Sequence, residues 1–443
     1  MKIKILFSGL LSVLIFFNLG SQTPDWENSQ VNQTNQEPAH ASINHFPNEK
    51  SALTCERTKS EWVLPLNGLW QYKLVNSPTE RPTEFPLPNF NASSWDRVAI
   101  PEKYDSNTQN LSLFSKENNK VASYRKVFPI PEGWYGQQIF VRFEGVTSAF
   151  YVWMNGKRVG YTEFGKHGAE FNVTPYVTFG RMNTLAVQVF SWSDNCLVEP
   201  CDSVFGIYSD VSIFVIPNVS IVDYALDAGL TNKYKDGTFN LNILVKKYLP
   251  SIKEKFKLTV SLKNEEGREI FPAIIKDVNP SKKVDSLLTI VQSIPHVKKW
   301  NRNNPYLYTL LMTLRDKDNN VVDAVSTKVG FREIETTNGE LKVNGNIVNL
   351  DSVKVLQASC KSFNQLRFLD GCDKNGDYVI ETPVQSQSTD AGKEFINCLH
   401  TQFQRDKNRT CIIKWSLDDI TNTNSKDKAK LWFQQVEKIR PVE

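Results

Sequence analysis

The sequence has little of what metal, redox and nucleic-acid proteins usually need. Its 443 residues include five histidines and seven cysteines, and no spacing of these residues matches a zinc site. The formal net charge of +4 comes from 52 basic and 48 acidic residues, which is too small and too mixed in sign to predict nucleic-acid binding. Hydrophobic residues (40%) and charged residues (23%) stand in globular proportions, so a disordered, collagen-like or coiled-coil chain is excluded.

One long apolar run is present, at the start of the chain. Lys2 and Lys4 precede the apolar run 5–17, and small residues follow it. This pattern is typical of a secretory signal peptide over residues 1–21, and the run is shorter than the ~20 residues that a membrane-spanning helix needs. We therefore expect a secreted or periplasmic protein without a membrane span.

An oxidising compartment permits disulfides, but the odd number of cysteines leaves at least one unpaired. Cys196 and Cys201 are close enough in sequence to form a bridge. The sequence leaves open whether they do.

From residue 60 the sequence alternates apolar and polar residues with the period of half-buried strands. The alternation is clear over 139–144 and 185–189, and Asn155-Gly156 between two further runs predicts a two-residue hairpin turn. The polar residues of these runs are expected on the opposite face from the core: Arg142, Glu144 and Gln188.

A second all-β unit follows Pro217. Alternation returns over 239–245 and 256–262 and continues to about residue 333, which is roughly the size of an immunoglobulin-like sandwich.

The pattern of apolar and polar residues changes after residue 350. Residues 395–403 fit a helix, 411–417 fit a buried strand, and 427–439 fit another helix. Alternating strands and helices of this kind indicate βα units.

Several runs resemble β-galactosidases of glycoside hydrolase family 2, in order and nearly without gaps over about residues 25–350. They are LNGLWQYKL, SYRKVFPIPEGWYGQQIFVRFEGVTSAFYVWMNGKRVGYTE, NTLAVQVFSWSDN and WNRNNPYLYTL. The resemblance implies a mainly β fold with a jelly-roll sugar-binding domain, an immunoglobulin-like β-sandwich and the beginning of a (β/α)8 barrel. The expected divisions after the signal peptide are an N-terminal extension (22–59), the jelly roll (60–217), the sandwich (218–333) and a truncated, partial TIM-barrel catalytic domain (334–443).

Length limits the third division. Residues 334–443 number 110, whereas a closed (β/α)8 barrel takes roughly 250. We expect this segment to be poorly ordered alone or to pack irregularly on the sandwich, because open strand edges and an apolar interior are costly to expose.

The proton donor that the resemblance implies is replaced. A retaining glycosidase needs two carboxyl groups ~5 Å apart, and the family's donor is the Glu that ends a W-S-L-G-N-E strand. Here the run reads WSLDDI, so Ile420 takes the donor's place, and neither Asp418 nor Asp419 is positioned to replace it. The family's nucleophile comes from a later strand that the resemblance does not find before residue 443. We therefore expect no catalytic residue in this chain.

The resemblance also implies Mg²⁺ and Na⁺ as cofactors. The run NGDYVIETPVQS resembles a family strand whose Glu-x-His holds Mg²⁺; Glu381 matches the Glu, but Pro383 stands in place of the His. Glu381 is thus the candidate metal ligand, and the alternative is a solvated or capping carboxylate. We expect the Mg²⁺ site to be lost, and no cofactor is assigned.

Two positions match the family's sugar contacts. Asn118 matches the Asn of an E-N-x-x-G-x-Y run, and Asp202 matches the second Asp of an L-E-D-Q-D-M-W run, whose Met-Trp is missing here and which is shortened before GIYSDVSIF. An amide and a carboxylate can hydrogen-bond vicinal hydroxyls, although loop Asn and Asp residues are also common in turns and caps. The resemblance implies weak contact with galactosides at these residues.

Three functions remain open on the sequence. One is an active β-galactosidase, which hydrolyses terminal non-reducing β-D-galactose residues; the replaced donor argues against it. A second is a non-catalytic secreted carbohydrate-binding or interaction protein, that is, a pseudoenzyme. The third is an incomplete gene product without activity. The oligomeric state is left open.

Overall fold

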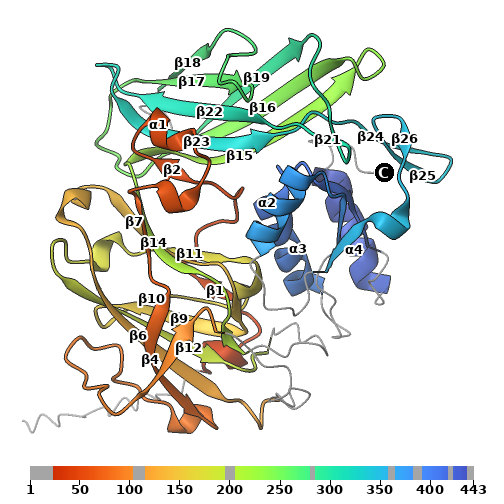
Figure 1. Ribbon diagram of the computed structural model, residues 1–443. Helices are drawn as coiled ribbons and strands as arrows, with labels where there is room; N and C mark the ends of the chain where they lie inside the picture. The colour runs from red at the N-terminus through yellow and green to blue at the C-terminus, as the bar shows by residue number, and fades with distance from the viewer. Residues whose placement is uncertain are drawn as a thin grey trace, which may run out of the picture.

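Two β-sandwiches and a smaller α/β unit make up the computed structural model, which describes residues 23–102, 115–194, 205–279, 285–357, 365–382, 392–417 and 423–436 (Figure 1). The first sandwich is orange to yellow-green in Figure 1, the second green to cyan, and the α/β unit blue. The prediction of a mainly β chain is confirmed. The signal-peptide prediction and the Cys196–Cys201 pair fall outside the described residues.

The first sandwich packs a seven-stranded sheet, in the order β1-β10-β9-β12-β6-β4-β5, on a four-stranded sheet, in the order β11-β7-β14-β3. Neighbouring strands in both sheets are antiparallel. The strands are β1 (Gln33–Thr34), β3 (Val63–Pro65), β4 (Gly68–Val75), β5 (Asp96–Ile100), β6 (Val121–Pro129), β7 (Gln138–Phe143), β9 (Ala149–Met154), β10 (Lys157–Thr162), β11 (Ala169–Asn172), β12 (Met182–Phe190) and β14 (Val211–Ile216), with a short pair formed by β8 (Val146–Thr147) and β13 (Gly206–Ile207).

The predicted hairpin is confirmed between β9 and β10. Met154 pairs with Lys157, and the two turn residues have positive φ angles, 51° for Asn155 and 80° for Gly156. Positive φ at both central positions gives a turn whose twist matches that of the flanking strands.

The strand over 139–143 is confirmed as β7, but the expectation that its polar side chains face solvent is wrong. Every residue of β7 is buried, and Arg142 is 7% exposed. Gln188 of β12 is also buried and donates to the Pro82 carbonyl at 3.2 Å. The face opposite the sandwich core is covered by other parts of the chain, so alternation in sequence does not correspond to exposure here.

The second sandwich packs a three-stranded sheet, in the order β15-β16-β19, on a five-stranded sheet, in the order β18-β17-β22-β23-β2. Its strands are β2 (His45–Phe46), β15 (Val219–Thr231), β16 (Asp236–Lys247), β17 (Phe256–Lys263), β18 (Ile274–Val278), β19 (Asp285–Ile294), β22 (Tyr308–Arg315) and β23 (Val321–Val329).

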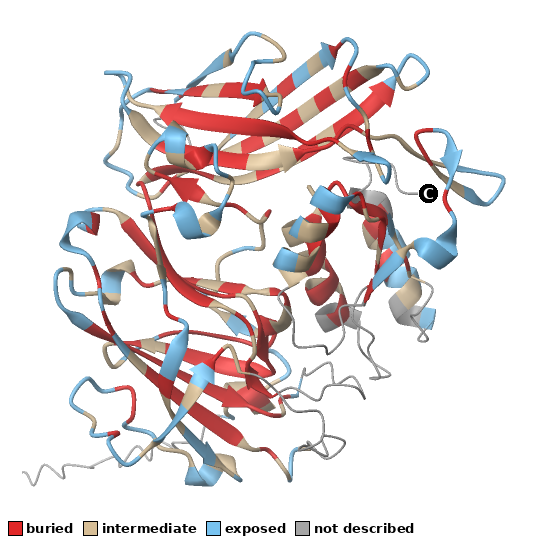
Figure 2. Ribbon diagram, in the orientation of Figure 1, coloured by how far each residue is buried: buried red, intermediate tan, exposed pale blue. Residues whose placement is uncertain are grey.

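Alternation does predict burial in β16. From Asp236 to Lys247 buried and half-buried residues alternate without a break, and the buried set includes Phe239, Leu241 and Ile243. Figure 2 shows this alternation as bands along strands of the second sandwich.

The N-terminal extension adds a strand to each sandwich, which the sequence did not predict. Its β1 pairs with β10 of the first sandwich, and its β2 pairs with β23 of the second, followed by the short helix α1 (Glu49–Ala52). In Figure 1 this red segment runs from the lower sandwich to the upper one.

A buried polar network fixes β2. His45 Nδ1 lies 3.1 Å from Asp323 Oδ1, and the other carboxylate oxygen accepts from the Ser220 hydroxyl (2.7 Å) and the Ile221 amide (3.0 Å). Asp323 is fully buried. Its carboxylate therefore ties the extension to β15 and β23.

The α/β unit begins with a small antiparallel sheet and continues as three βα units. The sheet contains β24 (Ile334–Thr337), β25 (Glu340–Val343) and β26 (Asn346–Ile347). The βα units contain the parallel strands β27 (Lys354–Gln357), β28 (Val379–Thr382) and β29 (Ile412–Trp415), and the helices α2 (Gln365–Asn375), α3 (Gly392–Asp406) and α4 (Thr423–Val436). The predicted βα alternation is confirmed.

The described part of this unit packs regularly, against the expectation of irregular packing. One apolar cluster joins its Leu369 and Val379 to Trp300 and Leu307 of the second sandwich, and another, which includes Phe403, lies within the unit. The second sandwich meets it at the amino ends of the strands: Arg332 Nη2 donates to the Ile412 carbonyl at 2.7 Å, and Trp300 Nε1 donates to the Asp373 carbonyl at 2.8 Å.

Replacing Asp323 with Ala should lower the free energy of unfolding by about 3 kcal/mol, because it leaves buried His45 and Ser220 without their partner. The measurement is the urea midpoint of the full chain. Asp318→Ala, at an exposed carboxylate before the same strand, is the control and should leave the midpoint unchanged. A midpoint of Asp323→Ala equal to that of the control would contradict the assigned role of the network.

Candidate functional site

The carboxyl ends of β27, β28 and β29 form the edge at which α/β proteins with parallel strands place their chemistry. These strands carry a single acidic side chain, Glu381 of β28. β29 is the strand of the predicted donor run, and the run continues through Trp415 to Leu417 in the described part. Asp418, Asp419 and Ile420, and also Pro383, lie outside the described residues.

Glu381 points toward helix α3. Its Oε1 accepts from Gln402 Nε2 at 2.7 Å, and Arg405 Nη2 lies 4.0 Å from the same oxygen. Arg405 is held in turn by Asp406, whose two carboxylate oxygens accept from Arg405 Nε at 3.0 Å. The Glu381 side chain is fully buried, so the interpretation of Glu381 as a solvated carboxylate is wrong.

The surroundings of Glu381 do not fit Mg²⁺. This ion takes oxygen ligands in octahedral geometry, usually several carboxylates or waters. Glu381 instead faces an amide donor and the Arg405 guanidinium, whose positive charge opposes a cation. Among the described residues, no group of three or more His, Cys, Asp or Glu side chains could hold a metal ion.

Burial raises the pKa of Glu381 well above its ordinary value, and the negative charge of Asp406 adds to this effect. Arg405 and the Gln402 hydrogen bond oppose the shift without cancelling it. Burial therefore favours the protonated form of the Glu381 carboxyl relative to an exposed glutamate.

Of the two predicted sugar contacts, the structure describes Asn118, which precedes β6 of the first sandwich. Asn118 is half-buried in a turn, in which its amide donates to the Ser115 carbonyl at 3.1 Å. The neighbouring Asn119 donates from Nδ2 to the Trp192 carbonyl at 3.0 Å, close to the segment that leads to Asp202. Asp202 itself is outside the described residues.

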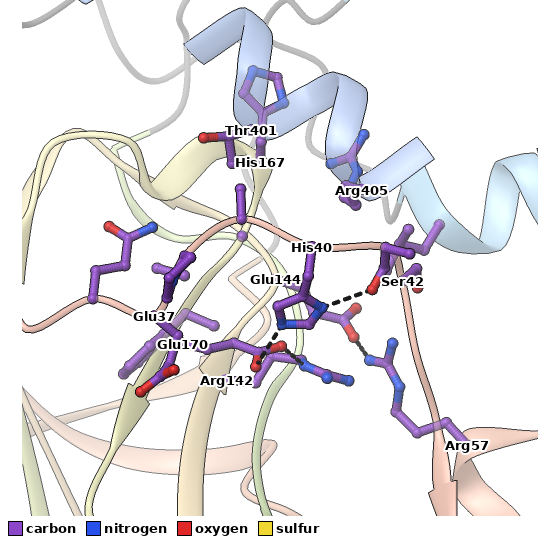
Figure 3. A pocket seen from close by; sticks show the side chains of 18 residues that line it. Glu37, His40, Ser42, Arg57, Arg142, Glu144, His167, Glu170, Thr401 and Arg405 are labelled. Atoms are coloured by element: carbon purple, nitrogen blue, oxygen red, sulfur yellow. Dashed lines mark hydrogen bonds and ion pairs between the residues drawn. The ribbon is translucent and has the colours of Figure 1, made fainter. Parts of the chain in front are cut away.

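A polar chamber lies where the extension, the first sandwich and α3 meet (Figure 3). Its volume is about 70 Å³. His40 of the extension has Nε2 3.2 Å from Glu170 Oε2, and Arg142 Nε donates to the other oxygen of that carboxylate. Arg57 of the extension forms an ion pair with Glu144, as Figure 3 shows.

His167 also lines the chamber. It ends the short 3-10 turn Gly165–His167, is 2% exposed, and neither ring nitrogen has a hydrogen-bond partner in the described part of the chain. Burial lowers the pKa of His167 well below its ordinary value, and the charge of Arg405 adds to this effect. The imidazole is therefore neutral at physiological pH.

The sequence did not identify the chamber. Its charged residues come from segments that are far apart in the chain, and no local motif joins His40 to Glu170 or Arg405. Composition offered one weak signal, because His40 and His167 are two of only five histidines in the chain.

No helix in the described ranges is long and apolar enough to cross a membrane. Among the described cysteines, Cys55, Cys372 and Cys411 are free thiols.

Two family models match the chain. Residues 63–217 match "Glycosyl hydrolases family 2, sugar binding domain", and residues 219–332 match "Glycosyl hydrolases family 2". Together the two matches cover more than half of the chain.

The chain is similar to curated bacterial enzymes named beta-galactosidase. It is 27% identical to that of Priestia megaterium, with 89% of this chain and 45% of the relative aligned. It is also 27% identical to that of Psychromonas ingrahamii, with 95% of this chain and 46% of the relative aligned. The chain thus spans about half the length of these relatives.

Solved structures share the fold. A glycosyl hydrolase family 2 member from Bacteroides cellulosilyticus superposes with a TM-score of 0.71 at 18% identity, covering 86% of this chain and 57% of that chain. A Bacteroides uniformis beta-glucuronidase gives 0.71 at 18% identity, covering 85% and 51%.

Glu381→Gln tests the protonated state of this carboxyl. Because the pKa is raised in the folded state, the contribution of Glu381 to stability is fully present below ~4.3 and is lost as the pH rises through the folded pKa. Gln does not titrate, so the urea midpoint of the variant should rise relative to wild type between pH 5 and pH 8.

Glu340→Gln, which removes an exposed carboxylate from the same unit, should show no such gain. A difference between Glu381→Gln and wild type that is equal at pH 5 and pH 8 would mean that Glu381 is ionised in the folded chain.

Proposed function

Because this chain belongs to glycoside hydrolase family 2, we propose that it contacts galactosides through its first sandwich and does not hydrolyse them. Its relatives are named beta-galactosidase, which makes a terminal β-D-galactose the proposed ligand.

The proposal that hydrolysis is absent rests on the number and orientation of the carboxyl groups at the strand ends. A retaining glycosidase needs a donor and a nucleophile about 5–5.5 Å apart. The three described strands carry only Glu381, and its carboxyl is turned to α3 and bound by Gln402. A group held in this way is not available to protonate a glycosidic oxygen.

The sequence supports the same proposal at the donor position. Ile420 has no proton to give, and Asp419 follows a strand in which alternate residues face opposite sides. We assign neither a catalytic residue nor a Mg²⁺ site to this chain.

The first sandwich supports residual ligand contact. The turn that carries Asn118 is tied through the Asn119 side chain to the main chain of Trp192, so these residues lie in neighbouring segments. An indole face can stack on a pyranose ring, and the amide can bond its hydroxyls. With Asp202 these groups would give weak binding. The run at 1–21 supports export, so we propose that this contact takes place outside the cytoplasm.

The purified chain incubated with a nitrophenyl β-D-galactoside and Mg²⁺ should release no nitrophenol above the buffer rate, since Ile420 stands at the donor position of the sequence and Glu381 is bound by Gln402. Asp419→Asn should give the same result. Turnover in the unmodified chain that Asp419→Asn abolishes would overturn the proposal and identify Asp419 as the donor.

Ligand-observed NMR with galactose tests the binding. Asn118→Ala and Asp202→Ala should each weaken the saturation-transfer signal at least threefold, because each removes one hydrogen-bonding group of a weak site, worth ~1 kcal/mol. Asn91→Ala, an exposed position of the same sandwich, should leave the signal unchanged. A signal that none of the changes alters would place the sugar elsewhere; no signal with the unmodified chain would refute the binding.

A further inference from the structure

The extension makes one hydrogen bond to each of two other units within two residues. The amide of Ala41 donates to Asp223 Oδ1 of the second sandwich at 2.8 Å, and the amide of Ser42 donates to the Arg405 carbonyl of α3 at 3.1 Å. An interaction that fixes residues 41 and 42 therefore also fixes helix α3, and with it the α/β unit, beside the sandwiches.

His40, the preceding residue, makes the contact with the first sandwich. Its Nε2 lies 3.2 Å from Glu170 Oε2, and its Nδ1 lies 2.8 Å from the Ala41 carbonyl oxygen. Figure 3 shows the ring between the Glu170 carboxylate and the extension backbone. A carboxylate and a carbonyl both accept hydrogen bonds, so both ring nitrogens must donate. Only the imidazolium form carries two N–H groups.

The charges around His40 come from every unit. Burial and the Arg142 charge oppose protonation, whereas Glu170 favours it, and the net effect is a raised pKa of His40. The charged and titratable side chains that line the cavities around His40 are Glu37, His45 and Arg57 of the extension, Arg142, Glu144, His167 and Glu170 of the first sandwich, Asp223, Lys246, Tyr248 and Asp285 of the second, and Arg405 of α3.

Glu170 stays ionised as the partner of His40. Arg142 donates to its Oε1, and the charges of Arg142 and His40 lower the pKa of Glu170 far below its ordinary value despite burial. Through the accessible pH range, therefore, the titrating member of the pair is His40.

We propose that the contact of His40 with Glu170 and the Ala41 carbonyl, here called the clasp, depends on protonation of His40. As imidazolium, His40 binds residues 39–42 to the first sandwich; when it loses its proton, the junction of the three units becomes less stable. Neutral imidazole has one N–H, so one of its nitrogens then presents a lone pair to an acceptor oxygen, and that hydrogen bond is lost. The clasp is independent of the proposed galactoside contact.

The direction of the pH dependence follows from the raised pKa of His40. The stabilisation is fully present below the unfolded value of ~6.5 and is lost as the pH rises through the higher folded value. Acidification therefore tightens the junction, and alkalinisation loosens it.

Hydrogen–deuterium exchange of the full chain tests the clasp, because the amides of Ala41 and Ser42 are the hydrogen-bonded reporters. After correction for intrinsic exchange, the protection factor of the peptide covering 39–44 should fall about tenfold between pH 6 and pH 9 in wild type, the effect of one lost charge-assisted hydrogen bond. His40→Gln should show the low value at both pH values.

Two further variants complete the design. Glu170→Gln keeps the ring but removes the charge that favours its proton, so the fall should move to lower pH. His296→Asn, at an exposed histidine with a φ of 54° that Asn tolerates, should behave as wild type. The clasp is refuted if wild type shows no fall, if His40→Gln keeps the same fall, or if Glu170→Gln leaves its midpoint unmoved.

Discussion

The arrangement of the three units depends on backbone pairing by a segment that belongs to none of them. Residues 33–34 add a strand to one sandwich, and residues 45–46 add a strand to the other. Each addition covers part of a sheet edge whose N–H and C=O groups would otherwise be open, so the pairing is favourable at both ends. Once residues 33–34 and 45–46 are paired, the residues between them have little conformational freedom. These residues lie where α3 contacts the first sandwich.

Much of the fold could be predicted from the sequence because period two and turn chemistry are local. Asn155-Gly156 specified its hairpin, and β16 alternates as expected because only one of its faces packs on the other sheet. The pattern misled at β7, where Arg142 alternates with apolar residues yet is buried. Its charge is neutralised by Glu170, and its guanidinium carbon lies 4.4 Å from the centre of the Phe214 ring. Packed side chains therefore surround Arg142 where the sequence pattern predicts solvent. A single sequence does not show such packing.

The candidate site could be predicted only in part, for the same reason. The sequence placed Glu381 near the end of a strand, and the structure has it in β28. The side to which it points depends on Gln402 and Arg405, which follow 21 and 24 residues later on α3 and carry no motif. A buried carboxyl in such a place is easily taken for a metal ligand, whereas here it accepts a hydrogen bond from Gln402 and lies beside the Arg405 guanidinium.

Hydrogen bonds at the amino ends of the strands hold the α/β unit against the second sandwich. Trp300 and Arg332 contact the unit at the amino ends of its strands. The Gly330 amide donates a hydrogen bond to Thr410 Oγ1 at the same end, at 3.1 Å. In α/β folds the amino ends supply stability and the carboxyl ends supply catalysis. The proposed replacement of a donor Glu by Ile420 concerns a sequence position that follows β29. The hydrogen bonds of Trp300, Gly330 and Arg332 lie at the amino ends, whereas at the other side Arg367, near the start of α2, pairs with Asp210 of the first sandwich. The proposed loss of the donor would therefore leave the contacts with the second sandwich in place.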